Sequence, residues 1–181
     1  MARIHIHERE TPEGRKLKLL LQQAKITKAK AGILQKDFQQ PKAEDDGTTS
    51  KTQTLGDVAV DNEFGTPTIP ARPFVRGAEI KQRTKWFTKA TKWLHDLVTG
   101  KRQNVKETVG LIGLMMESDI RDQIRSNVPP PNAPSTIAKK TGMLTGKRKR
   151  KAEISGALGV GTLRDTGQML NAVSSEVTEG R

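Results

Sequence analysis

The organisation of this chain depends on one stretch, Glu63-Phe64-Gly65-Thr66-Pro67-Thr68-Ile69-Pro70-Ala71-Arg72-Pro73-Phe74, which holds three of its nine prolines and two of its four phenylalanines. Proline fixes φ near −65° and disfavours helical backbone in the residue before it. Thr66, Ile69 and Arg72 each precede a proline, so we expect extended backbone at all three. Because proline cannot donate a ladder hydrogen bond, such a segment lies at a sheet edge or outside a sheet. The sequence therefore predicts a stiff, extended arm.

This arm would present three apolar side chains, Phe64, Ile69 and Phe74, at set positions. Its partly fixed φ angles mean that docking on a neighbouring molecule loses less conformational entropy. Arg72 and Arg76 are candidates for charge-assisted hydrogen bonds at such an interface. Enzymes rarely need an arm of this kind, whereas proteins that dock against copies of themselves often do. The alternative is that the arm folds back on the core of its own chain.

The composition limits both the core and the partners. Apolar residues make up 33% of the 181 residues and aromatic residues 3%, both low for a globular protein. We therefore expect one domain with a modest core, and loops that become ordered on a partner. The net charge of +12 favours phosphate backbones, anionic membranes or acidic protein surfaces as partners.

Cysteine usage and hydropathy set further limits. The chain has no cysteine, which excludes disulfides and thiolate metal sites and fits synthesis in a reducing compartment. The longest strongly apolar run, residues 111–116, is interrupted by Gly113 and is far shorter than the ~20 residues of a membrane span. Residues 1–4 do not begin the apolar stretch of a secretory signal. We expect a soluble protein that is not directed to a membrane.

Hydrophobic periodicity predicts an α+β fold, with a small sheet packed against two or three amphipathic helices, the extended Pro-rich arm and long flexible loops. The expected strands are 3–8, 55–64 and 172–177, and the expected helices are 14–38, 77–98, 104–126 and a short helix that begins at Met169. A turn over 163–168 offers Asp165 or Thr166 as the N-cap of that short helix. The expected layout is an N-terminal strand and helix over 1–38, a linker over 39–54, an α+β core over 55–128 and 162–178, and a Pro-rich and basic loop over 129–161.

The two long helices have distinct faces, and we expect their apolar faces to pack together as core. The apolar face of helix 77–98 comprises Trp86, Phe87, Ala90, Trp93, Leu94 and Leu97, and a second face carries Lys81, Lys85, Lys89 and Lys92. The apolar face of helix 104–126 comprises Val105, Val109, Ile112, Met116, Ile120 and Ile124. Gly110 and Gly113 cost this helix roughly 1 kcal/mol each, which is usually accepted where another backbone approaches closely.

No group of residues indicates catalysis or metal binding. His5 and His7 share one face of a strand but lack a third ligand, and His95 lies on the polar side of its helix. The glycines of 156–161 lack the ending and the preceding buried strand of a phosphate-binding loop. Acidic residues are expected on an exposed helix face, in solvated ion pairs with nearby arginines: Glu117, Asp119 and Asp122 beside Arg121 and Arg125. We expect no enzyme and no cofactor.

The run Lys147-Arg148-Lys149-Arg150-Lys151 is the strongest local concentration of charge. Such a run can neutralise the phosphates of a nucleic acid, with an affinity that depends on salt but not on the nucleotide sequence. The alternative is a solvated run that keeps a flexible loop extended. The chain has no tyrosine and its aromatic residues lie on an apolar face, which disfavours a base-stacking platform.

Three stretches of the chain agree, in order, with a known pattern. They are Val58-Ala59 followed by 63–66 and 69–74; Ile124 through Pro129-Pro130-Pro131-Asn132-Ala133-Pro134-Ser135-Thr136-Ile137 with Lys139; and Leu163-Arg164-Asp165-Thr166-Gly167-Gln168-Met169. Together they resemble a signature of small virion-morphogenesis proteins, the tail-completion and neck proteins of long-tailed bacteriophages. The resemblance covers about residues 58–177. It does not extend to the N-terminal helix and linker or to the Lys/Arg run.

The resemblance implies a non-enzymatic subunit that is made in the bacterial cytoplasm and assembles as a ring at the head–tail junction of a virion. The implied partners are copies of itself, neighbouring head-connector and tail proteins, and genomic DNA in the channel, while the layer (completion, terminator or collar) stays open. The residues we expect at the subunit interface are Phe64, Gly65, Ile69, Pro70, Arg72, Pro73, Phe74, Arg76, Asp165, Thr166, Gly167 and Gln168. Those we expect to meet DNA or an acidic partner are Lys81, Lys85, Lys89, Lys92, Lys147, Arg148, Lys149, Arg150 and Lys151.

A second function, from another class, also fits the charge. The chain would then be a stand-alone basic nucleic-acid-binding protein, whose arm and basic loop fold on duplex DNA or on RNA through contacts to the phosphate backbone.

Overall fold

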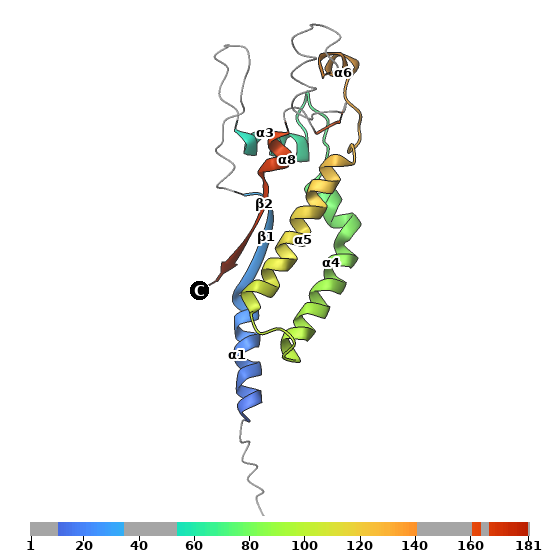
Figure 1. The fold of residues 1–181 in the computed structure, drawn as a ribbon. Coiled ribbons are helices and arrows are strands. Elements are labelled where there is room, and N and C mark those ends of the chain that lie inside the picture. The colour runs from blue at the N-terminus through green and yellow to red at the C-terminus, as the bar shows by residue number, and fades with distance from the viewer. Residues whose placement is uncertain (1–10, 35–53, 141–160, 164–166, 181) are drawn as a thin grey trace, which may run out of the picture.

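The computed structural model describes residues 11–34, 54–140, 161–163 and 167–180. It is α+β, as the sequence predicted: several helices accompany a two-stranded antiparallel sheet that packs against them. The described helices are α1 (Pro12–Ile26), α3 (Leu55–Phe64), α4 (Val75–Val98), α5 (Val105–Arg125), α6 (Pro134–Lys140) and α8 (Gln168–Ala172), and the strands are β1 (Thr27–Ile33) and β2 (Val173–Glu179) (Figure 1).

Helix α5 is the central element. It packs against α4 on one side and against both strands on the other, so that α4 and the sheet lie on opposite sides of it (Figure 1). The predicted helices over 77–98 and 104–126 are thereby confirmed as α4 and α5. Asn104 caps α5 by accepting a hydrogen bond from the backbone N–H of Glu107. The short elements α3, α6 and α8 gather at one end of this frame (Figure 1).

The sheet joins two distant parts of the chain. Thr27 of β1 pairs with Glu179 of β2, and Ile33 pairs with Val173. The sheet lies directly over Gly113 of α5, where an added Cβ would be 3.4 Å from the Cβ atoms of Ala29 and Ser175. The predicted close approach of another backbone to this glycine is therefore confirmed.

The predicted helix over 14–38 is wrong in its second half. Helix α1 ends at Ile26, and Thr27 takes extended backbone and begins β1. Burial then alternates along the strand, with Thr27 buried, Lys28 and Lys30 exposed, and Ala29 half-buried. This alternation suits a strand that has one face on α5.

The predicted strand over 55–64 is wrong, because these residues form helix α3. Thr54 and Asp57 form a capping box: each side chain accepts a hydrogen bond from the backbone N–H of the other residue. Leu55, Ala59 and Glu63 are buried at intervals of four residues, which is a helical period and not a strand period. Local capping and a single buried face thus outweigh the β-branched side chains of this segment.

At the other end of the chain, the predicted short helix and final strand are confirmed as α8 and β2. The N-cap of α8 is Gly167, with φ of 79°, and not Asp165 or Thr166 as predicted. Those two residues lie outside the described ranges, as do the predicted strand over 3–8, residues 39–53 of the predicted linker, His5, His7, the glycines of 156–160 and the Lys/Arg run at 147–151.

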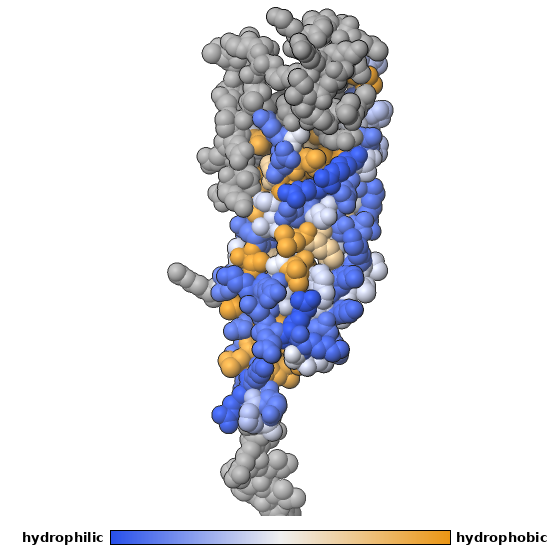
Figure 2. Space-filling model, in the orientation of Figure 1, coloured by the Kyte–Doolittle hydropathy of each residue, from blue (hydrophilic) through white to orange (hydrophobic). Residues whose placement is uncertain are grey.

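The buried side chains form two clusters. The larger lies where α3, α8 and the N-terminal half of α4 meet the C-terminal half of α5: Ala59, Phe74, Ala78, Ile120, Ile124, Val128, Leu163, Met169 and Val173. The smaller lies at the turn between α4 and α5, against α1 and the sheet: Leu97, Val105 and Val109. On the face shown in Figure 2, hydrophilic residues predominate and apolar residues form small patches among them.

The predicted apolar face of α4 enters the core only in part. Leu97 is buried and Trp86 and Trp93 are half-buried, but Phe87 and Leu94 are exposed. The predicted face spans a ~120° arc of the helix, and one neighbouring helix covers less than that. Phe87 and Leu94 lie at the outer edge of this arc.

Asp119 departs from its predicted place on a solvated surface. It is buried between α4 and α5, where it accepts hydrogen bonds from Lys85 Nζ and from the indole Nε1 of Trp86, each at 2.6 Å. The other predicted acidic pairs are present: Glu117 with Arg121 at 2.7 Å and Asp122 with Arg125 at 2.8 Å. Asp119 therefore links the two long helices through buried hydrogen bonds.

Among the described residues, no helix is both long enough and apolar enough to cross a membrane.

Candidate functional site

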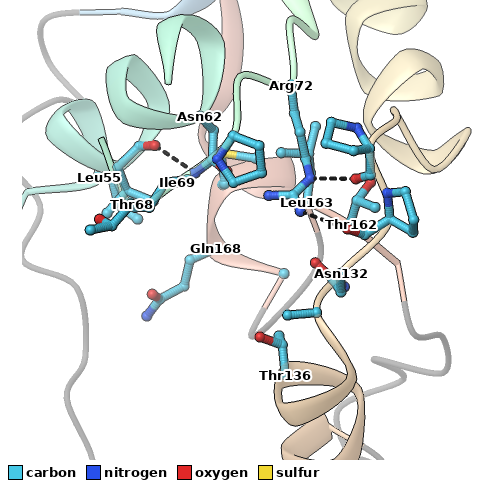
Figure 3. Close-up of a pocket in the computed structure, with 17 residues that line it drawn as sticks. Leu55, Asn62, Thr68, Ile69, Arg72, Asn132, Thr136, Thr162, Leu163 and Gln168 are labelled. Carbon is cyan, nitrogen blue, oxygen red and sulfur yellow. Dashed lines mark hydrogen bonds between the residues drawn. The ribbon is translucent and has the colours of Figure 1, made fainter. Parts of the chain in front are cut away.

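The three stretches that carry the phage resemblance meet in space. Residues of 63–74, 129–137 and 163–169, with neighbours from α3, line one hollow of about 500 Å³ at the α3–α8 end of the molecule (Figure 3). Its walls are Leu55, Val58, Asn62, Thr68, Ile69, Pro70, Arg72, Pro130, Pro131, Asn132, Ala133, Thr136, Thr162, Leu163, Gly167, Gln168 and Met169. Segments separated by scores of residues thus form a single structural unit.

Arg72 joins the first two of these stretches. Its Nε donates to the carbonyl oxygen of Pro130 at 2.8 Å, and its Nη2 donates to that of Pro131 at 3.2 Å (Figure 3). The residue is only 7% exposed, and this burial lowers the pKa of Arg72 below its ordinary value. A guanidinium offers several donors in a fixed plane, so it can hold two successive carbonyls at once. Asn132 extends the link by donating to the carbonyl oxygen of Gly161 at 3.2 Å.

The Pro-rich segment is a folded loop, not the predicted extended arm. Gly65 ends α3 with φ of 80°, and an added Cβ there would lie 2.8 Å from the backbone nitrogen of Ala71. The N–H of Thr66 donates to the carbonyl of Ile69 at 2.8 Å, and Arg72 N–H donates to Asn62 O at 2.6 Å. The chain therefore turns back on itself, which is the alternative that the sequence left open. The prolines restrict φ locally, but the left-handed backbone of Gly65 sets the direction of the loop.

Glu63 fixes the start of α4. Its carboxylate accepts hydrogen bonds from the backbone N–H groups of Phe74, Val75 and Arg76 at 2.7, 3.0 and 3.1 Å. These donors have no partner within a helix, and negative charge is favourable at this end of the helix dipole. Arg76 completes the arrangement, because its Nε donates to Glu63 Oε1 at 2.9 Å and its Cζ lies 4.7 Å from the ring centre of Phe64. Both predicted interface arginines, Arg72 and Arg76, thus make their hydrogen bonds within the chain.

The two phenylalanines of the segment have opposite environments. The sequence predicted that Phe74 presents its ring to a neighbouring molecule. Instead, Phe74 is 2% exposed and lies in the larger core cluster. Phe64 is 64% exposed, and Val60, one turn earlier on α3, is exposed beside it. Pro70 is exposed too, and Ile69 is half-buried at the rim of the hollow. We call Val60, Phe64, Ile69 and Pro70 the α3 patch.

Of the remaining predicted interface residues, Asp165 and Thr166 lie outside the described ranges. Gln168 and Gly167 line the hollow, and Pro73 is half-buried beside Phe74.

The predicted lysine face of α4 is divided between two environments. Lys81 donates to Gln123 Oε1 at 2.9 Å and Lys85 donates to Asp119, so both are turned toward α5. Lys89 and Lys92 are exposed. The first two lysines are therefore occupied within the chain, and the other two are accessible to a partner.

Sequence reasoning missed two residues that organise this molecule, Glu63 and Asp119. A signal for Glu63 was present: α4 begins after Phe74, which has no side-chain acceptor, so the helix needs an acceptor from elsewhere. Asp119 lies one residue before Ile120 of the predicted apolar face, and this position next to the core was the available signal.

Within the described ranges, no cluster of three or more His, Cys, Asp or Glu side chains is placed to hold a metal ion. The side chains around the hollow supply hydroxyl, amide and apolar groups and one guanidinium, all on a framework of caps and turns. Such a framework holds the α3 patch in a fixed arrangement. Comparison of the chain with protein-family models, with curated proteins and with solved structures found no match.

Proposed function

We propose that this protein is a structural subunit of a bacteriophage neck, which forms a ring at the head–tail junction and is needed for tail completion or attachment. The resemblance of its three motif stretches to virion-morphogenesis proteins is the starting point. One structural observation supports it above all: these stretches close around one hollow and are tied together by Arg72. If a signature scattered along the sequence encodes one functional surface, its residues are expected to lie together in the folded chain.

The α3 patch is the proposed subunit contact. It places Phe64, an aromatic anchor, at one end of the molecule, with Val60 exposed one turn earlier on α3 and with Ile69 and Pro70 at the hollow in the loop that follows. Aromatic side chains held in a fixed orientation contribute strongly to interfaces, and Arg76 holds Phe64 from one side. A ring needs a head-to-tail interface, in which this patch meets a different surface of the next copy.

The proposal is tested by the native mass of the purified chain at low and at physiological salt, with and without duplex DNA. We expect a closed oligomer whose mass is indifferent to DNA. The variant Phe64→Asp should remain monomeric, because the substitution places a charge at the centre of the contact. The matched variant Leu114→Asp changes an equally exposed residue on α5 and should still assemble.

Two results would count against the proposal. A small species that binds duplex DNA and releases it as salt rises would favour the stand-alone nucleic-acid-binding protein. An oligomer that forms equally well with Phe64→Asp would exclude the α3 patch from the subunit contact.

A further inference from the structure

Helix α4 carries an apolar seam on the side that faces away from α5. Its members are spaced alternately by four and three residues: Ile80, Thr84, Phe87, Thr91, Leu94 and Val98. This is the spacing of the contact positions of a coiled coil. We call these six residues the outer seam.

The outer seam is exposed. Ile80 is 79% exposed and Phe87 is 69% exposed, and the other four members are exposed as well. Within the described part of the chain, α4 packs mainly against α5 and touches α1, and neither helix buries these side chains. A stripe of four exposed apolar side chains, with threonines between them, on one face of a helix is suited to docking another helix.

The surface beside Phe87 is slightly hollowed. Phe87, Thr88, Thr91, Lys92 and His95 border a shallow, open depression. In helix pairs of the coiled-coil type, a side chain of one helix inserts between residues of the facing helix. The two threonines of the seam add polar groups, which favour one defined register of the helix pair over nonspecific hydrophobic contact.

One edge of the outer seam is basic. In coiled-coil register it holds Lys81 and His95, with Lys92 beside them, and Lys81 also donates to Gln123 Oε1 of α5. The other edge holds Arg83, with Glu79 one turn earlier. Charged residues at the edges of a helix pair select the partner, so the basic edge favours a helix with acidic residues facing it.

The same charges disfavour a second copy of this chain as the occupant. Helix α4 has six Lys or Arg residues against two acidic ones, and α1, which also exposes leucines, has four against one. Pairing α4 with either helix of another copy would bring together two helices that both carry an excess of positive charge.

We propose that the outer seam of α4 docks an amphipathic helix of a different protein, whose apolar seam is bordered by glutamate or aspartate. This inference goes beyond the proposed function: it assigns a second surface, along α4, and it stands whether or not the chain forms a ring.

The test uses the full chain and a synthetic helical peptide as long as α4, with leucine at the seam positions and glutamate at both edges. A second peptide carries lysine at the edges. Binding is followed by fluorescence anisotropy of labelled peptide. We expect the glutamate peptide to bind at least about tenfold more tightly than the lysine peptide, and the difference to shrink as salt screens the edges.

Variants then locate the binding site. The double variant Ile80→Glu with Phe87→Glu should weaken binding of the glutamate peptide by about thirtyfold or more, the usual effect of losing a central anchor. Leu114→Glu makes the same chemical change on an exposed face of α5 and should leave binding unchanged. Because all three residues are exposed, each variant should keep the melting temperature of the parent chain.

Three results would overturn the inference. The first is equal affinity for the two peptides, or glutamate-peptide binding that survives the double variant. The second is a dimer of the chain alone that the double variant dissolves, which would assign the seam to a second copy. The third is binding to vesicles of anionic phospholipid that the double variant abolishes, which would assign the seam to a lipid surface.

Discussion

The indole Nε1 of Trp86 donates a hydrogen bond to Asp119 Oδ2 over 2.6 Å, across the interface of the two long helices. The other carboxylate oxygen of Asp119 pairs with Lys85 at the same distance. A buried carboxylate with two donors therefore fixes both the separation and the rotation of α4 relative to α5. Replacing both partners by apolar groups would remove the specificity of this arrangement together with its hydrogen bonds.

Asp119→Ala should lower the free energy of unfolding by about 1–3 kcal/mol, because it leaves the Trp86 N–H without its acceptor in a half-buried position. Denaturant titration followed by tryptophan fluorescence measures this loss. Asp122→Ala is the matched control, since its pair with Arg125 is exposed and its loss should change stability by less than about 0.5 kcal/mol. Equal effects of the two substitutions would show that Asp119 does not brace the helices.

Phe74→Ala should destabilise the chain by about 3–5 kcal/mol, because it removes a fully buried ring from the larger core cluster. Phe64→Ala should have little effect on thermal unfolding, although it removes an equally large side chain. The comparison is made by calorimetry on dilute protein. If Phe74→Ala were harmless to the isolated chain and blocked only assembly, Phe74 would belong to an interface and not to the core.

Gly113→Leu should destabilise the chain by about 1–3 kcal/mol, because an added Cβ would already touch Ala29 and Ser175 at 3.4 Å and the rest of the leucine side chain would press on the sheet. Gly110→Ala should instead be neutral or stabilising by up to about 1 kcal/mol, since its new Cβ would meet only a Val177 methyl at 3.5 Å and alanine favours helix. Urea titrations of both variants test the contrast. A harmless Gly113→Leu would mean that the strands do not lie on α5 in solution.

Stability should also fall in acid through Asp57. The hydroxyl of Thr54, and then its backbone N–H, hold the pKa of Asp57 below its ordinary value of 3.8. A carboxyl whose pKa is lowered by folding stabilises the fold above its ordinary value and loses that contribution as pH falls through the lowered one. We therefore expect Asp57→Asn to flatten the dependence of melting temperature on pH in this acid range. Glu79→Gln, an exposed change on α4, should leave the curve as it is.

The elements that the sequence predicted well are those with a long, uniform period. Helices α4 and α5 each repeat their apolar positions over several turns, and Asn104 marks a start that a single sequence can show. The end of α1 was missed, since Leu17 to Ala24 and then Ala31 and Leu34 continue a helical spacing across the true boundary. What decides that boundary is pairing with β2, a partner near the other end of the described chain.

The candidate site was predictable in its residues but not in its arrangement. The prolines indicated extended backbone at Thr66, Ile69 and Arg72, but the turn at Gly65 depends on a close approach to Ala71 that only the folded chain shows. The role of Arg72 likewise depends on carbonyl groups almost sixty positions away. Capping by Thr54 and Asp57, in contrast, was visible in the sequence and was outweighed by the alternating valines of α3.

The pairing of β1 with β2 also affects how the chain is made. A ribosome releases residues 27–33 well before residues 173–179, so the first strand waits while α3, α4 and α5 are made before its partner emerges. During that wait the edge of β1 is open to any other extended segment. Helices α4 and α5 can form their hairpin in the meantime, because their contacts are local. The last step of folding is then the arrival of the C-terminal strand on a helical surface that is already built.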